Sequence, residues 1–105
     1  MNNFLPLCLA KPGPVIDLQC HFEPLNCKWE EPEQPNGQIT NYNINLTHNG
    51  MLILNATEKD TFWSPKIKLT LGQMYTVSVS PVTYAIGPSV STSFDFSHPS
   101  MLNTF

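Results

Sequence analysis

Residues 27–42 read CKWEEPEQPNGQITNY and predict a strand, a turn and a second strand. Cys27 and Trp29 alternate with Lys28 and Glu30, which is the period of two shown by a half-buried strand. Two prolines and an Asn-Gly pair then interrupt the pattern, as expected of a turn. Because one indole buries more apolar surface than any other side chain, we expect Trp29 to be the centre of the core.

The alternation resumes after the turn. Tyr42, Ile44 and Leu46 form the apolar side of the second strand, whereas Asn43 and Asn45 are expected to face water. This pattern is typical of an antiparallel sheet with one face on the core and the other in solvent.

Four segments, in this order and spacing, resemble the fibronectin type III family. They are WEEP at 29–32, PNGQITNY at 35–42, LTLGQMYTVSV at 69–79 and YAIGP at 84–88. The resemblance extends over about residues 13–97. Its one visible departure is Leu71, which stands where the family commonly has proline.

The resemblance implies an all-β fold, a seven-stranded antiparallel immunoglobulin-like sandwich of fibronectin type III topology with sheets ABE and C′CFG. Residues 15–22 are expected to form strand A, 62–69 strand E and 89–96 strand G. Tyr75 resembles the tyrosine corner of such sandwiches, in which the phenol bonds to nearby backbone. The expected core consists of Leu18, Trp29, Tyr42, Ile44, Leu69, Tyr75, Val77 and Val79. Trp63 is expected to pack on its own domain rather than on a ligand.

The domain is expected to span residues 13–97, with residues 1–12 and 98–105 as linkers. Residues 2–10 are apolar but lack a basic start, so a linker is preferred over part of a signal peptide. Prolines at the start of the domain favour a first strand protected from pairing with other chains.

Composition argues against several classes of partner. The chain has 105 residues, only 12% of them charged, and a net charge of −3. Binding to nucleic acid or to an anionic membrane would require clustered Lys and Arg, so neither is expected. No apolar run approaches the roughly 20 residues of a transmembrane helix. Any membrane attachment would come from a segment elsewhere in a longer protein.

Cys20 and Cys27 lie on the two arms of an expected hairpin, each on the face of a core residue. We predict a disulfide between them, worth about 2–3 kcal/mol in the chain-entropy model. Two reduced buried thiols remain the alternative. A zinc site with His21 is disfavoured, since neighbouring residues on a strand point to opposite faces. Cys8 is expected to be unpaired in this chain.

Two glycosylation sequons begin at Asn45 and Asn55. Asn45 falls on the outward phase of its strand, and Asn55 is expected to point outward with Leu52 and Leu54 pointing inward. The Asn49-Gly50 pair between the sequons predicts a type I′ hairpin turn.

No catalytic motif is recognisable, so no enzymatic activity and no cofactor or metal are expected of this chain. The histidines are scattered, at positions 21, 48 and 98. The resemblance instead implies an extracellular spacer, adhesion or protein-binding module in the ectodomain of a cell-surface receptor, with a receptor-type tyrosine phosphatase as the leading parent.

Two alternatives stay open. The Cys-x-Trp pattern at 27–29 also resembles a ligand-binding module of cytokine-type receptors, whereas reduced cysteines and absent glycans would favour an intracellular structural module. The partner would be a protein ligand or a neighbouring domain. The expected contact residues are Tyr84 and Ile86 with an acidic rim of Glu30, Glu31 and Glu33, near Asn36.

Overall fold

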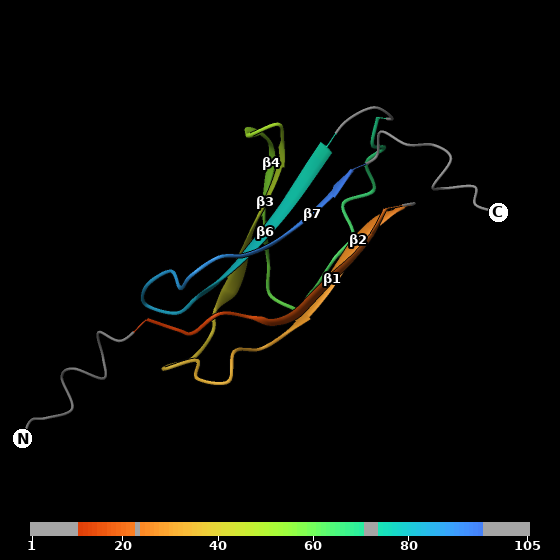
Figure 1. Ribbon diagram of the computed structural model, residues 1–105. Coiled ribbons are helices and arrows are strands. Elements are labelled where there is room, and N and C mark those ends of the chain that lie inside the picture. The colour runs from red at the N-terminus through yellow and green to blue at the C-terminus, as the bar shows by residue number, and fades with distance from the viewer. Residues whose placement is uncertain (1–10, 23, 71–73, 96–105) are drawn as a thin grey trace, which may run out of the picture.

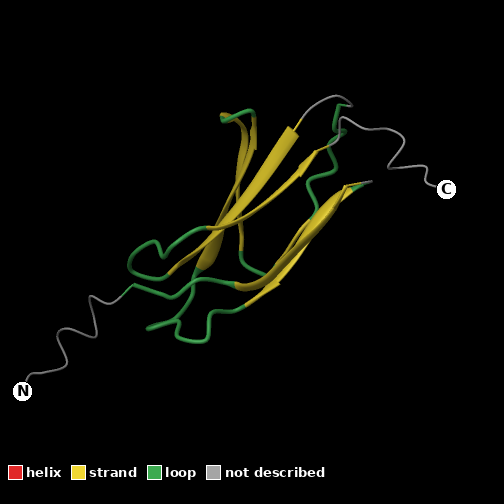
Figure 2. Cartoon of the chain, viewed as in Figure 1, coloured by secondary structure: helices red, strands yellow, loops and turns green. Residues whose placement is uncertain are grey.

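The computed structural model describes residues 11–22, 24–70 and 74–95, which form two antiparallel β-sheets (Figure 1). The first sheet has the strand order β1-β2-β5 and the second the order β4-β3-β6-β7. The strands are β1 (Ile16–Phe22), β2 (Leu25–Glu30), β3 (Asn41–His48), β4 (Met51–Glu58), β5 (Phe62–Trp63), β6 (Met74–Val82) and β7 (Val90–Asp95). The described residues contain strands and loops but no helix (Figure 2). The predicted all-β sandwich with sheets ABE and C′CFG is confirmed.

β3 and β6 are the inner strands of the larger sheet, and their sequences explain that position. In β3, buried Tyr42, Ile44 and Leu46 alternate with half-buried polar residues, and β6 buries Val77 and Val79 in the same way. Ile44 is paired with Val79, and Leu46 with Val77. The two strands therefore present one continuous apolar surface to the smaller sheet.

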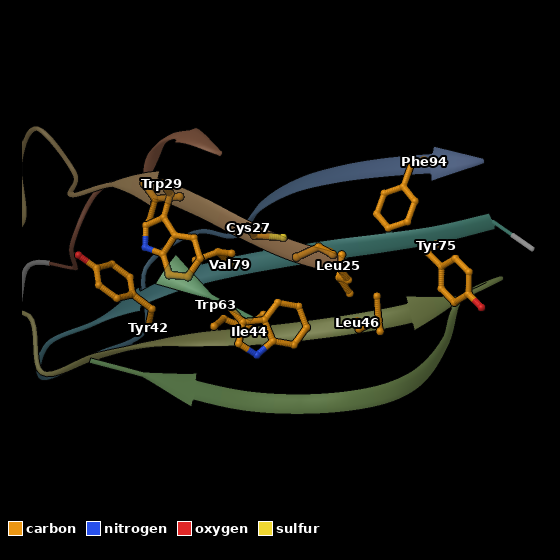
Figure 3. Close-up of a cluster of buried hydrophobic side chains, with 12 residues drawn as sticks. Leu25, Cys27, Trp29, Tyr42, Ile44, Leu46, Trp63, Tyr75, Val79 and Phe94 are labelled. Carbon is orange, nitrogen blue, oxygen red and sulfur yellow. The ribbon is translucent and has the colours of Figure 1, made fainter. Parts of the chain in front are cut away.

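The core lies between the two sheets (Figure 3). Trp29 from β2 meets Tyr42 from β3 edge to face, with ring centroids 5.4 Å apart and an interplanar angle of 69°. The buried apolar residues are Val15, Leu25, Cys27, Trp29, Tyr42, Ile44, Leu46, Trp63, Tyr75, Val77, Val79 and Phe94. Trp63 packs on its own domain, as expected. Two residues expected in the core, Leu18 and Leu69, are only partly buried at its margin.

Strand E is shorter than expected. The pairing of β5 with β2 ends at Trp63, and residues 64–70 contain no strand. Pro65 has no N–H to give to a ladder, and Lys66 has a φ of 58°, which is incompatible with extended backbone. Both features stop the strand where the sequence pattern alone suggested that it continued to residue 69.

The β3–β4 hairpin turns as predicted but pairs differently. Asn49 and Gly50 have φ values of 52° and 80°, the positive values that a type I′ turn requires. The register then shifts, because Leu46 is paired with Leu54 whereas Thr47 is paired with Leu52. Ile53 is the extra residue, and Leu52 is 58% exposed. The expectation that Leu52 points inward is therefore wrong.

The tyrosine corner is confirmed. The backbone N–H of Thr70 donates a hydrogen bond of 2.9 Å to the phenol oxygen of Tyr75. The Tyr75 ring is buried and lies beside the rings of His48 and Phe94, with centroids 5.6 and 5.8 Å away. This bond fixes the segment that leads from the first sheet into β6.

Replacing Trp29 with Ala should lower the free energy of unfolding by about 3–5 kcal/mol, because it removes a buried indole and leaves a cavity between the sheets. Urea denaturation of the two proteins measures the difference. Phe62→Ala is the matched control, since Phe62 is an aromatic residue that is 51% exposed, and it should cost under about 1 kcal/mol. Equal losses for the two variants would contradict this account of the core.

Candidate protein-binding surface

The turn after β6 carries the two apolar side chains of the expected contact surface, and both are exposed. Val82 forms an isolated bridge with Ile86, and the N–H of Thr83 donates to the carbonyl of Ala85 at 3.0 Å. Tyr84 stands at the tip of this tight turn and is 81% exposed, and Ile86 is 54% exposed. The turn therefore presents an aromatic and an aliphatic side chain from a hydrogen-bonded backbone.

The loop between β2 and β3 packs against this turn. The N–H of Thr40 donates to the carbonyl of Val82 at 2.9 Å. A Cβ atom on Gly37 would lie 3.6 Å from Cε2 of Tyr84, so the tyrosine ring borders this glycine. Gly37 also has a φ of 143°, which disfavours any side chain there. We call the loops 31–40 and 83–87 together the loop end.

Residues 11–13 lie between the two loops. The carbonyl of Lys11 accepts a hydrogen bond of 2.7 Å from the Asn36 side chain, and the N–H of Gly13 donates to the carbonyl of Gln34 at 2.9 Å. Pro12 is buried against Gly87, where an added Cβ would lie 2.6 Å from the Pro12 carbonyl oxygen. The segment expected to be a linker up to residue 12 is thus packed onto the domain from Lys11 onward.

The three glutamates of the expected acidic rim are all exposed but occupy different places. Glu30 ends β2 and lines a shallow hollow with Asp17, Gln19, Lys28 and Trp29. Glu33 lines a second hollow beside Gly13 and Pro14. Glu31 lies close enough to Tyr42 for its charge to act on that phenol.

The pKa of Tyr42 is raised, first because burial disfavours the phenolate and second because of the negative charge of Glu31. An unfolded tyrosine ionises near pH 10, so the unfolded chain loses this proton at a lower pH than the folded chain. The resulting stability is complete below about pH 10 and is lost as the pH rises through the folded pKa.

The outward face of the larger sheet is polar and uncharged over its centre. Hydroxyl pairs join β6 to β7, with Thr76–Ser93 and Ser78–Ser91 each at 2.8 Å. Asn45 and Asn55 are directly paired across β3 and β4, and Nδ2 of Asn55 donates to Oδ1 of Asn45 at 2.7 Å. The two sequon asparagines therefore lie side by side on this face, with Asn55 exposed.

Cys20 and Cys27 are joined by a disulfide between directly paired residues of β1 and β2, with a Cα–Cα distance of 4.0 Å. Cys27 is fully buried in the core, so the bond ties the outer strand β1 to the interior. Cys8 lies outside the described residues. Among residues 11–22, 24–70 and 74–95, no cluster of three metal-ligating side chains occurs. The same residues contain no helix that is long and apolar enough to cross a membrane.

Solved structures share this architecture. Domains d3–d4 of the rat CD45 extracellular region match with a TM-score of 0.74 and 16% identity, over 81% of this chain and 49% of that one. Titin domains A168–A170 match with a TM-score of 0.67 and 15% identity, over 84% of this chain and 33% of that one. The Caenorhabditis elegans twitchin kinase region matches with a TM-score of 0.65 and 18% identity, over 84% of this chain and 17% of that one. No family profile and no curated protein matches the sequence.

The fold is that of a fibronectin type III domain. The chain spans about half or less of the length of the structures that it resembles. Their names describe an extracellular region in one case and a kinase region in another, so the likeness establishes the architecture and leaves the role of this chain to its own residues.

The loss of stability above pH 10 should be smaller in Tyr42→Phe than in the parent chain, because the variant has no phenol to ionise at this position. Urea denaturation at pH 8 to about 11 measures the slope of unfolding free energy against pH. Glu31→Gln should retain most of the slope, since burial is the larger cause of the raised pKa. An unchanged slope in Tyr42→Phe would contradict the assignment.

Proposed function

We propose that this chain is an extracellular fibronectin type III module in the ectodomain of a multi-domain cell-surface receptor, where it spaces neighbouring domains or binds a protein. The Cys20–Cys27 disulfide is the observation that carries this proposal, because disulfides persist in oxidising compartments. The adjacent sequons at Asn45 and Asn55 support the same compartment. The likeness to the extracellular region of CD45 is compatible with this compartment, and the sequence resemblance makes a receptor-type tyrosine phosphatase the leading parent.

The loop end is the surface that we propose for contact. Tyr84 and Ile86 offer apolar area on a backbone that is already hydrogen-bonded, so little conformational entropy would be lost on binding. The chain enters the domain at this same end, between the two loops at Lys11 to Gly13. A domain preceding this one in a tandem array would therefore meet Tyr84 first, and a separate protein ligand is the second candidate for the same surface.

Secretion of the chain from a eukaryotic cell tests the compartment. We expect its intact mass to fall on glycosidase treatment and to rise by two hydrogens on reduction of the Cys20–Cys27 bond. Thr47→Ala and Thr57→Ala each remove one sequon and should each remove the mass of one glycan if both sites are occupied. A secreted chain without glycan and with free Cys20 and Cys27 would contradict the proposal in favour of an intracellular module.

Substituting Tyr84 and Ile86 together with Ser should weaken a contact made by the loop end without lowering the melting temperature, because both side chains are exposed. Binding is measured with the intact ectodomain and its ligand, and domain orientation by small-angle scattering of the chain with its preceding domain. Phe62→Ser with Met74→Ser is the matched control, because both side chains are about half exposed and lie outside the loop end. If neither binding nor orientation changes in Tyr84→Ser/Ile86→Ser, the loop end is not the contact surface.

A further inference from the structure

β4 is an outer strand of the larger sheet and has the chemistry of an edge open to pairing. It is eight residues long and, in the described part of the chain, pairs only with β3. An outer strand presents a row of unpaired N–H and C=O groups along its free side. Soluble proteins commonly protect such rows with charges or proline, yet residues 51–57 contain neither.

Three of the seven large, exposed apolar side chains of the described residues lie next to one another on this strand. Met51, Leu52 and Ile53 are consecutive and are 69%, 58% and 49% exposed. The other outer strand of the sheet, β7, instead carries serines and a threonine and ends at Asp95. The outer strands of the smaller sheet are β1, which is preceded by Pro12 and Pro14, and β5, which has only two residues. Among the outer strands of the described residues, β4 therefore combines length with an exposed apolar surface, and its one charged residue, Glu58, stands at its end.

The sequon side chain on β4 does not occupy the free side. Nδ2 of Asn55 donates to Oδ1 of Asn45 at 2.7 Å and to Oδ1 of Asn43 at 3.2 Å, both on β3. The amide of Asn55 thus lies over the outward face of the sheet and points toward β3, away from the free side of β4. The main-chain groups on the outer side of β4 remain available.

We propose that β4 is a self-association edge, at which two copies of this chain join by antiparallel pairing of their β4 strands. The two four-stranded sheets would then form one continuous sheet across a two-fold axis, an isologous interface in which the same residues serve on both sides. The exposed segment 51–53 would be covered, and the free N–H and C=O groups of both strands would gain partners.

The charge of β4 favours antiparallel over parallel pairing of two copies. Glu58 is the one charged residue of β4 and stands at its end. Antiparallel pairing over residues 51–57 places the two Glu58 side chains at opposite ends of the ladder, whereas parallel pairing would place like charges together. One pair of strands buries less than the roughly 1,200–2,000 Å² of a standard stable interface, so the association should be weak and dependent on concentration.

The test is sedimentation velocity of the chain produced without glycans, in a Cys8→Ser background that prevents intermolecular disulfides. The average mass should rise toward that of a dimer as the concentration approaches the order of 100 µM. Ile53→Lys puts a charge at an exposed position on each copy, and it should keep the chain monomeric with an unchanged melting temperature. Phe62→Lys makes the same change at similar exposure on the other sheet and should leave association intact.

Hydrogen exchange locates the contact independently. Amides of β4 should exchange more slowly at high than at low concentration, while those of β7 should not change. The proposal is overturned by a chain that stays monomeric, by association that survives Ile53→Lys, or by protection that appears on β7. Because the protein carries no glycans in these experiments, their result does not depend on whether the chain is extracellular.

Discussion

The edge-to-face contact of Trp29 and Tyr42 is the interaction on which the two-sheet arrangement depends most. Trp29 belongs to the three-stranded sheet and Tyr42 to the four-stranded sheet, so their contact spans the interior. The indole N–H is buried and has no hydrogen-bond partner among the described residues. The indole ring is therefore held by packing and not by a hydrogen bond from its ring nitrogen, whereas the Trp29 main chain is fixed by its bond to the carbonyl of Thr61 at 3.1 Å.

The sequence was most informative where its alternation is regular. β3 keeps a period of two, and β6 keeps it as far as Val79, so these buried residues could be predicted directly, whereas the burial of Ser80 and Pro81 departs from it. The Tyr75 corner followed from the family resemblance. The proximity of Cys20 and Cys27 could also be read, because a short hairpin forces nearby residues to face each other. These are local consequences of strand geometry and need no knowledge of distant contacts.

Other features depend on contacts that local patterns do not contain. The shift at Ile53 comes from pairing with β3, and the alternation within 51–54 gave no sign of it because all four residues are apolar. The contact of Lys11 and Gly13 with the loop before β3 joins residues more than 20 positions apart. The sequence predicted Tyr84 and Ile86 as contact residues because they lie in a loop. That Glu30 and Glu33 line two separate hollows is visible only in the folded chain.

The disulfide has a mechanical consequence for a domain whose described chain begins and ends at opposite ends of the molecule (Figure 1). A force pulling on residue 11 would first break the hydrogen bonds at Lys11 and Gly13 and then peel β1 from β2, starting at Ile16. Peeling must stop at Cys20, because a covalent bond holds it to Cys27 in the core. Beyond that point the force acts on β2 through Cys27. Extending the chain further then requires β2 to separate from the other sheet, which breaks the contact of Trp29 with Tyr42.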